Sequence, residues 1–293
     1  MRSIHTLLHG LIDYAGLFPP AQLDMAGAVA GYSSYRAGPH CWALGRFVVP
    51  VSRLAEFESA ATPWLRAAGT PWKLAALAGP DLPADLATIT ALNSRVAGGA
   101  LVDSIELKAA TADAIARALT TVDARVDVYV EIPIGDDPAP LFDALARHGG
   151  RGKVRTGGVT PDAFPSPGQL LRFLRRSREA GVPFKATAGL HHPLRGAYRL
   201  TYAPNSACAT MFGFLNLFLA AAFLDHGMDD VDGLALLEET SPQAFSFEEE
   251  GVTWRSHRLA DAEMRHARRR SGLAFGSCSF TEPIDDLQAL GLL

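Results

Sequence analysis

Short apolar runs alternate with amphipathic stretches along this chain. Eight runs have the length and composition of β-strands, namely residues 11–17, 46–51, 72–78, 103–108, 126–132, 153–157, 183–190 and 274–280. Between most of them, apolar residues recur at helical spacing, as in residues 52–68, 112–121, 140–147 and 168–180. Regular alternation of strands with helices predicts βαβ units and a parallel sheet.

Eight strands in this pattern predict a closed (β/α)8 TIM barrel, and 293 residues are enough for one such domain over residues 1–293. A doubly wound open sheet is the alternative fold, but no glycine-rich fingerprint follows the first strand. The connection at residues 191–272, between strands 7 and 8, is far longer than an ordinary loop. We expect this long insertion to be an accessory segment, with a small hairpin outside the barrel at residues 245–254.

The longest apolar run covers residues 211–224, with the sequence MFGFLNLFLAAAFL. It is shorter than the roughly 20 residues that a helix needs to cross a bilayer. The run therefore predicts a buried or interface helix and no membrane association. Its position in the long insertion suggests a homodimer.

Composition narrows the class of protein. The chain is 48% hydrophobic and 20% charged, its net charge is −4, and its acidic and basic residues are interspersed. These values are ordinary for a globular protein and give no support to a nucleic-acid partner. The cysteines, Cys41, Cys208 and Cys278, are widely spaced, which predicts neither a disulfide framework nor a zinc site and favours a reducing cytoplasm.

Five of the expected strands carry polar residues on one face. Successive strand side chains point to opposite faces, and the polar pairs are Glu106 with Lys108, Tyr129 with Glu131, Lys153 with Arg155, Lys185 with Thr187, and Ser277 with Ser279 opposite Cys278. The outer face of a barrel packs under helices and is apolar, so we expect these polar faces to point inward. Such clusters are typical of the C-terminal mouth of a barrel, where active sites lie. A structural ion-pair network is the alternative interpretation.

Lysine is rare in this chain. Only four of the 27 Lys and Arg residues are lysine, and each lies in a strand-like run: Lys73, Lys108, Lys153 and Lys185. A lysine amine can act as a nucleophile or a proton carrier, whereas arginine stays charged. An amine attacks a carbonyl only when it is neutral, and a second ammonium nearby lowers its pKa. Lys153 and Lys185, expected on adjacent strands and facing inward, meet that need.

Several strand motifs resemble deoxyribose-phosphate aldolase and, more loosely, the class I (Schiff-base) aldolase barrels. IDYAGLFP at 12–19 is similar to that family's first-strand motif Ile-Asp-His-Thr-Leu-Leu-Lys-Pro, and matches it at Ile12, Asp13, Leu17 and Pro19. VDSIELK at 102–108 is similar to the family's Asp-Glu-Val-Asp strand, and FGSCSF at 275–280 to its Gly-Thr-Ser-Ser strand. Two further runs resemble its lysine strands: KVRTGG at 153–158 the Lys-Thr-Ser-Thr-Gly strand, and FKATAGL at 184–190 the Lys-Ala-Ser-Gly-Gly strand. The motifs fall in order on five of the eight expected strands.

The resemblance implies an aldolase-like carbon–carbon lyase that acts on a small anionic carbonyl compound through a lysine Schiff base, without a cofactor. Lys153 is the expected nucleophile and Lys185 the partner that lowers its pKa, while Glu106 or Glu131 would move protons. The chain departs from the family at the phosphate loop, where Ala188 replaces the first glycine. This departure points to a different substrate.

A wider set of residues is expected around that substrate. Asp13 and Tyr14 would contact a hydroxyl, although a loop-capping role for Asp13 stays open. Arg46, Arg155 and the adjacent histidines would hold a carboxylate or phosphate, whereas Cys278 is expected to face outward. The full expected set is Asp13, Tyr14, Arg46, Lys108, Arg155, Thr187, Gly189, His191, His192, Ser277 and Ser279.

Two alternative functions stay open at this point. One is a metal-assisted lyase or isomerase that uses Glu131, His191 and His192. The other is a barrel without catalysis that binds a small anion, or binds a protein partner through the apolar helix and the rest of the long insertion. The aldolase interpretation, in contrast, requires a small-molecule substrate and no metal.

Overall fold

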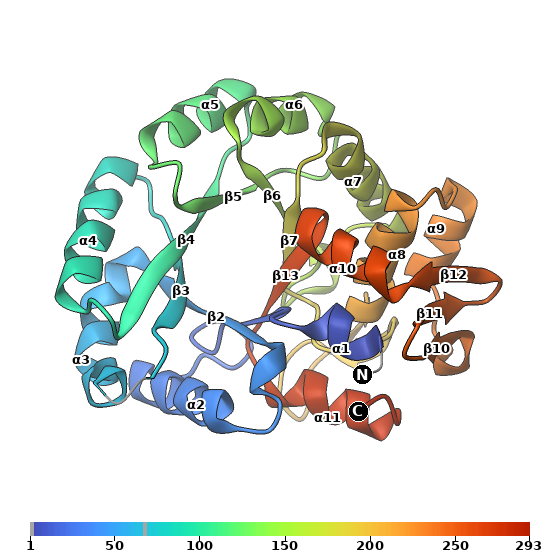
Figure 1. Ribbon diagram of the computed structural model, residues 1–293, viewed down its shortest axis with the longest axis horizontal. Coiled ribbons are helices and arrows are strands. Elements are labelled where there is room, and N and C mark those ends of the chain that lie inside the picture. The colour runs from blue at the N-terminus through green and yellow to red at the C-terminus, as the bar shows by residue number, and fades with distance from the viewer. Residues whose placement is uncertain (1–2, 67–68) are drawn as a thin grey trace.

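The computed structural model describes residues 3–66 and 69–293 and contains a closed barrel of eight parallel strands (Figure 1). Around the barrel the strand order is β1-β13-β7-β6-β5-β4-β3-β2, so the last strand pairs with the first. The predicted (β/α)8 fold is confirmed. The barrel strands are β1 (Ile12–Tyr14), β2 (Leu44–Pro50), β3 (Trp72–Leu77), β4 (Ala100–Lys108), β5 (Asp127–Glu131), β6 (Arg151–Arg155), β7 (Phe184–Thr187) and β13 (Gly272–Ser277).

A ring of helices surrounds the barrel, one after each strand (Figure 1). In chain order they are α2 (Met25–Ala37), α3 (Leu54–Leu65), α4 (Leu82–Arg95), α5 (Ala112–Thr121), α6 (Ala139–His148), α7 (Pro167–Ala180), α8 (Phe214–Asp225) and α11 (Thr281–Ala289). Three helices are additional to this ring: α1 (Ser3–Leu8), α9 (Asp230–Leu237) and α10 (Asp261–Arg270). The helix predicted over residues 52–68 corresponds to α3, and its residues 67–68 lie outside the described part of the chain.

Helix α7 shows how local sequence sets the boundaries of these elements. Ser166 accepts a hydrogen bond from the backbone of Gln169, whose side chain accepts one from the backbone of Ser166, and Pro167 occupies the first turn. This capping box satisfies backbone groups that the helix leaves free at its N-terminus. Gly181 ends the helix in the left-handed conformation, at φ +63°, which glycine adopts without steric cost.

The segment between β7 and β13 is partly barrel and partly additional structure. It begins with a hairpin of β8 (Gly196–Arg199) and β9 (Cys208–Met211), followed by α8 and α9. Phe214 and Phe218 of α8 pack on Phe275 of β13 at ring centroid distances of 5.2 and 5.9 Å. Helix α8 is therefore a barrel-covering helix, and the expectation that all of residues 191–272 are accessory is wrong. Helices α7, α9 and α10 pack around α8, which explains why α8 is apolar on all sides.

The remaining elements of this segment form a layer outside the barrel. Strands β10 (Phe245–Phe247), β11 (Gly251–Trp254) and β12 (His257–Ala260) make an antiparallel sheet, so the hairpin predicted at 245–254 is confirmed and has a third strand. Within the apolar helix, the buried Asn216 accepts from the backbone N–H of Arg195 and donates to the carbonyls of Leu236 and Glu239. Asn216 thereby joins α8 to the segments on both of its sides. No helix among the described residues is long and apolar enough to cross a membrane.

Candidate active site

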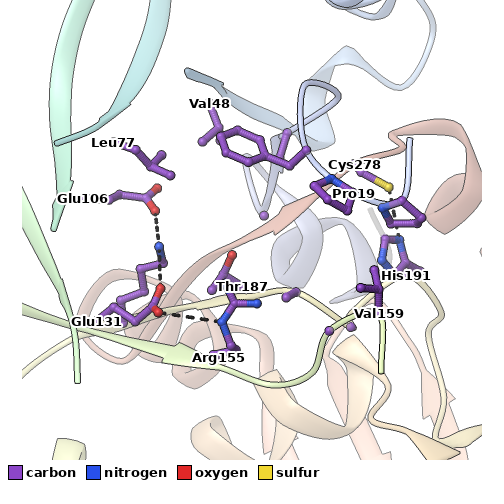
Figure 2. A pocket seen from close by; sticks show the side chains of 18 of the residues that line it. Pro19, Val48, Leu77, Glu106, Glu131, Arg155, Val159, Thr187, His191 and Cys278 are labelled. Carbon is purple, nitrogen blue, oxygen red and sulfur yellow. Dashed lines mark hydrogen bonds and ion pairs between the residues drawn. The ribbon is translucent and has the colours of Figure 1, made fainter. Parts of the chain in front are cut away.

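A cavity of about 300 Å³ lies at the C-terminal mouth of the barrel (Figure 2). The last residues of five strands line it: Leu77, Lys108, Glu131, Arg155 and Thr187. Parallel strands end at the same rim of a barrel, which is where barrel enzymes carry their catalytic groups. The position alone makes this cavity the candidate site.

Two lysines and three carboxylates form a continuous chain of ion pairs at the base of the cavity. The Lys185 ammonium lies 2.5 Å from Asp13 Oδ2 and 2.6 Å from Glu106 Oε1. The Lys153 ammonium lies 2.8 Å from Glu106 Oε2 and 2.9 Å from Glu131 Oε2. The Glu106 carboxylate therefore bridges the two lysines, with one oxygen on each.

Strand register explains this arrangement. Lys153 of β6 is directly opposite Lys185 of β7, and both point into the barrel as the sequence predicted. Glu131 of β5 is opposite Lys153. Glu106 reaches both lysines from β4, two strands away from β6. The two glutamates therefore lie on the neighbouring strands β4 and β5, and the two lysines on the next two strands, β6 and β7.

The electrostatic balance within the chain keeps its central groups charged. Burial opposes a charge on Lys185, but the carboxylates of Asp13 and Glu106 outweigh it and raise the Lys185 pKa well above its usual range. Burial likewise opposes a charge on Glu106, but Lys153 and Lys185 lower its pKa to about 2. Lys185 is consequently a permanent cation at neutral pH, and Glu106 a permanent anion.

A second set of charges lies nearer to the opening. Glu131 remains an anion because its pKa is lowered, against the effect of burial, chiefly by Lys153. Its Oε1 lies 3.7 Å from Arg155 Nε and 3.7 Å from Lys108 Nζ. The side chains of Lys108 and Arg155 are 77% and 50% exposed and line the cavity, so these two cations are accessible to a solute that enters it.

The loop after β7 brings the backbone close to the cavity. Ala188 and Gly189 both have positive φ, at +62° and +72°, and both line the cavity with Thr187. The Thr156 hydroxyl donates to the Ala188 carbonyl at 2.5 Å and fixes this turn. A Cβ at Gly189 would lie 2.9 Å from the Gly157 Cα, so the close approach of the two loops requires glycine there.

Histidine and cysteine meet at the edge of the cavity. His191 Nδ1 lies 3.3 Å from Glu282 Oε2 and 3.9 Å from Cys278 Sγ (Figure 2). Burial opposes a charge on His191, but its contacts with Cys278 and Glu282 raise its pKa to about 9. Cys278 lines the cavity, so the expectation that it faces outward is wrong. The outward residue of β13 is Phe275, which packs under α8, and alternation from Phe275 turns Gly276 and Cys278 inward.

The same alternation moves the two serines away from the cavity. Ser277 shares the outward face with Phe275 and is 1% exposed. Ser279 accepts a hydrogen bond from the backbone N–H of Glu282 at the start of α11. Their expected role at the substrate is therefore wrong, because the contrast between Ser and Cys is too weak to identify the inner face.

Tyr14 and Arg46 also lie elsewhere than expected. Tyr14 is on the face of β1 opposite Asp13 and packs among Tyr32, Tyr35 and Phe47, beneath α2. Arg46 does point into the barrel, but it lies at the start of β2, on the other side of Asp13 from the cavity.

Arg46 belongs to a separate ion-pair layer inside the barrel. Its Nε donates to Asp103 at 2.6 Å and its Nη2 lies 3.4 Å from Asp127. Asp127 also pairs with Arg151. This layer beneath the cavity is therefore a structural ion-pair network, which is the alternative interpretation of the inward-facing charges.

The adjacent histidines point in different directions. His192 Nδ1 lies 2.6 Å from Asp286 and its ring stacks on Tyr198 at 3.6 Å, so it does not line the cavity. Glu131 is bound to Lys153 on the far side of the cavity from His191 (Figure 2). The structure therefore does not bring Glu131, His191 and His192 together. No group of three such side chains within residues 3–66 and 69–293 is arranged to hold a metal ion.

Sequence reasoning missed the apolar part of the cavity. Val48 and Leu77 line it from β2 and β3, and Phe18 and Pro19 from the loop after β1. Alternation along β2 and β3 is a signal that identifies Val48 and Leu77 as inward. The hairpin residues that line the cavity, Leu200 and Met211, carry no comparable local signal.

No protein-family model matches this chain, and no curated protein has a sequence that matches it. The chemistry of the cavity is therefore inferred from its own residues.

Proposed function

We propose that this protein is a carbon–carbon lyase of the aldolase type, which acts on a small anionic carbonyl compound through a Schiff base at Lys153. The observation that carries the proposal is the bridged pair of lysines, Lys153 and Lys185, at the base of a cavity in the barrel mouth. An imine-forming enzyme needs a nucleophilic amine beside a fixed positive charge and a group that moves protons. In this proposal Lys153 supplies the amine, Lys185 the fixed positive charge and Glu131 the group that moves protons.

The positions of the lysines favour Lys153 as the nucleophile. Both lysines lie between two carboxylates, but the contacts of Lys153 are longer, at 2.8 and 2.9 Å against 2.5 and 2.6 Å for Lys185. The Lys153 side chain is also more exposed, at 7% against 2%. The raised pKa of Lys185 keeps it charged, which suits a fixed cation and not an attacking amine. Glu131, which contacts Lys153 and lies nearer to the opening, would accept its proton before attack.

The proposed reaction consists of imine formation, cleavage of a carbon–carbon bond and release of two products. The Lys153 nitrogen attacks the substrate carbonyl carbon, the carbonyl oxygen takes up protons and leaves as water, and an iminium ion forms. A base removes the proton from the hydroxyl on the β-carbon, the bond between the α- and β-carbons breaks, and its electron pair enters the iminium to give an enamine. The β-carbon leaves as an aldehyde. Protonation of the α-carbon and addition of water then release the second product and restore the amine.

The charge around the cavity favours an anionic substrate. Four basic side chains line it, Lys108, Lys153, Arg155 and Lys185, against two carboxylates, Glu106 and Glu131. Because the pKa of His191 is about 9, that imidazole adds a further positive charge at neutral pH. A cavity with a net positive charge raises the local concentration of anions.

Borohydride trapping tests the proposal. The folded protein is incubated with a panel of small aldehydes and 2-oxo acids, reduced, and measured by intact mass and peptide mapping. We expect a reduced adduct on Lys153 in the wild type and its loss in Lys153→Ala. Lys73→Ala is the matched control, because Lys73 lies on another barrel strand, β3, but is exposed and outside the cavity.

Each outcome of the trapping has a defined meaning. An adduct on Lys153 that persists in Lys73→Ala supports the proposal. An adduct on Lys185 instead would reverse the roles of the two lysines. Wild-type protein that forms no adduct with any carbonyl, although circular dichroism shows it to be folded, would refute imine chemistry at this site.

A further inference from the structure

The cavity has two chemically different sides. Its charged side comes from β4 to β7 and includes Glu106, Glu131 and Arg155, whereas Val48 and Pro19 lie across the cavity from Arg155 (Figure 2). The apolar lining comes from the ends of β2 and β3, the loop after β1 and the hairpin β8–β9. It consists of Phe18, Pro19, Val48, Leu77, Leu200 and Met211.

We infer that the substrate is an amphipathic 4-hydroxy-2-oxo acid, whose carboxylate binds at Arg155 and Lys108 and whose C4 substituent is an apolar chain or ring. This inference rests on the proposed function and specifies its substrate. The aldehyde that leaves would then be an aliphatic or aromatic aldehyde. The retained fragment would be pyruvate or a close analogue.

The geometry of β6 indicates where the carboxylate of the substrate would bind. Arg155 lies two residues beyond Lys153 on the same inner face of β6, which corresponds to about 7 Å along the strand. The carboxylate of a 2-oxo acid is bonded to the carbon that forms the imine, so it lies within reach of the Arg155 guanidinium when that carbon is bound to Lys153. Arg155 is half exposed and makes only long contacts, at 3.7 Å to Glu131 and 3.4 Å to the Gly157 carbonyl. It is therefore available for a closer pair with a carboxylate.

The apolar side argues against a polyhydroxylated substrate. A sugar hydroxyl buried without a hydrogen-bond partner costs free energy, and the six apolar residues offer no side-chain donor or acceptor. Val48, Leu200 and Met211 are 5%, 4% and 2% exposed, so this part of the apolar side is well packed. An apolar substituent gains free energy in proportion to the area that it buries there.

The hairpin β8–β9 completes the apolar side and is held in place. The Tyr198 hydroxyl of β8 donates to the Leu194 carbonyl at 3.0 Å, and the Tyr198 ring stacks on His192 at 3.6 Å. This fixed hairpin brings Leu200 and Met211 to the mouth. We assign the hairpin a role in substrate specificity, because it adds two apolar residues, Leu200 and Met211, to the lining from outside the barrel strands.

The test measures aldol addition of pyruvate to a homologous series of aldehydes: propanal, butanal, pentanal and hexanal, with glycolaldehyde as the polar comparison. We expect kcat/KM to rise about fourfold for each methylene until the cavity is filled, which corresponds to the transfer free energy of one methylene group. Hexanal is expected to exceed glycolaldehyde by more than tenfold.

Two variants separate the apolar side from general effects. Leu77→Asn places an amide in the apolar lining, and we expect it to flatten the dependence on chain length. Val231→Asn is the matched control, since Val231 is 76% exposed on α9 and outside the cavity, and the dependence should persist in it.

The outcomes distinguish this inference from the proposed function. A pyruvate adduct on Lys153 with kcat/KM independent of chain length, or highest with glycolaldehyde, would overturn the inference and leave the proposed function standing. Adducts with aldehydes but not with pyruvate would also overturn it, because no carboxylate is then recognised. If no carbonyl gives an adduct, both are overturned.

Discussion

Replacing Lys185 by methionine removes the cation that holds Asp13 and Glu106 together. The side chain is 2% exposed and lies within 2.6 Å of both carboxylates. Methionine fills a similar volume, so the main change is the loss of the positive charge. Two buried carboxylates would then face each other without that partner.

The structure gives the size of the effect. A pKa of about 2 for Glu106, against 4.5 for the free side chain, corresponds to about 3 kcal/mol of native-state stabilisation at neutral pH, which Lys153 and Lys185 supply together. Breaking a buried ion pair by removing one partner costs roughly 3–5 kcal/mol. We therefore expect Lys185→Met to lower the free energy of unfolding by about 3–5 kcal/mol at pH 7.5, and the Tm by on the order of 10 °C.

The pH dependence of the stability deficit in Lys185→Met tests whether the lost charge causes it. Glu106 has a lowered pKa, so its contribution in the wild type is present above pH 4.5 and is lost as the pH falls towards 2. Lys185 has a raised pKa, so its contribution is present throughout the range below 10.5. In the variant, protonation at low pH removes the repulsion between the two carboxylates that have lost Lys185. The deficit in stability should therefore be largest near pH 7.5 and shrink towards pH 4.

Urea unfolding followed by circular dichroism at pH 7.5, 5.5 and 4.5 measures this deficit. Lys108→Met is the control, because Lys108 is 77% exposed and lies 3.7 Å from Glu131, so its loss should cost less than about 1 kcal/mol. A Lys185→Met deficit below about 1 kcal/mol at pH 7.5, or one that grows as the pH falls, would refute this account of the site.

Three further outcomes are expected. Arg46→Met should lower the Tm measured by calorimetry by several degrees, since it breaks the ion-pair layer. It should leave the borohydride adduct detected by intact mass in place, because Arg46 lies outside the cavity. Asn216→Leu removes the hydrogen bonds of this side chain with three backbone groups, and should lower the urea-unfolding free energy by about 2–3 kcal/mol. The His191 pKa of about 9 stabilises the protein fully below pH 6.5, so the wild-type Tm should fall between pH 6.5 and 9. Because Glu282 is a source of that shift, Glu282→Gln should weaken the fall; an equal fall in both proteins would contradict the assignment.

The fold and the charged half of the site could be predicted from local sequence. Strand-helix alternation requires only a repeating pattern, and all eight barrel strands were found at their expected places. Lys153, Lys185, Glu106 and Glu131 were placed inward because each shares a strand face with another polar residue and is flanked by apolar ones. This contrast is strong in β4 to β7.

Where the residues on the two faces of a strand differ little in polarity, alternation alone did not identify the inner face. In β13 the residues beside Cys278 are small, and the bulky Phe275, which defines the outer face, was a better guide than the serines. For Arg46 the prediction of an inward-facing side chain was correct, but its predicted position along the barrel axis, at the cavity, was not. Depth depends on how each strand is staggered against its neighbours around the barrel, which is a long-range property.

The apolar segment shows a different limit. An almost uniformly apolar run such as residues 211–224 indicates burial but does not tell what buries it. In this structure α8 is covered by the same chain, through the barrel on one side and α9 and α10 on others. The run therefore gives no support to the predicted homodimer, which stays untested.

The pairing of β1 with β13 has a consequence for how this protein is made. Ile12 pairs with Phe275, so the barrel closes only after almost the whole described chain has been synthesised. Until then β1 and β7 each present an unpaired strand edge, and such edges template aggregation. Contacts between residues this far apart also form slowly. During synthesis the interval before β13 emerges is thus when the nascent chain most needs chaperone protection, and substitutions that weaken β13 should reduce the yield of folded protein more than the stability of molecules already folded.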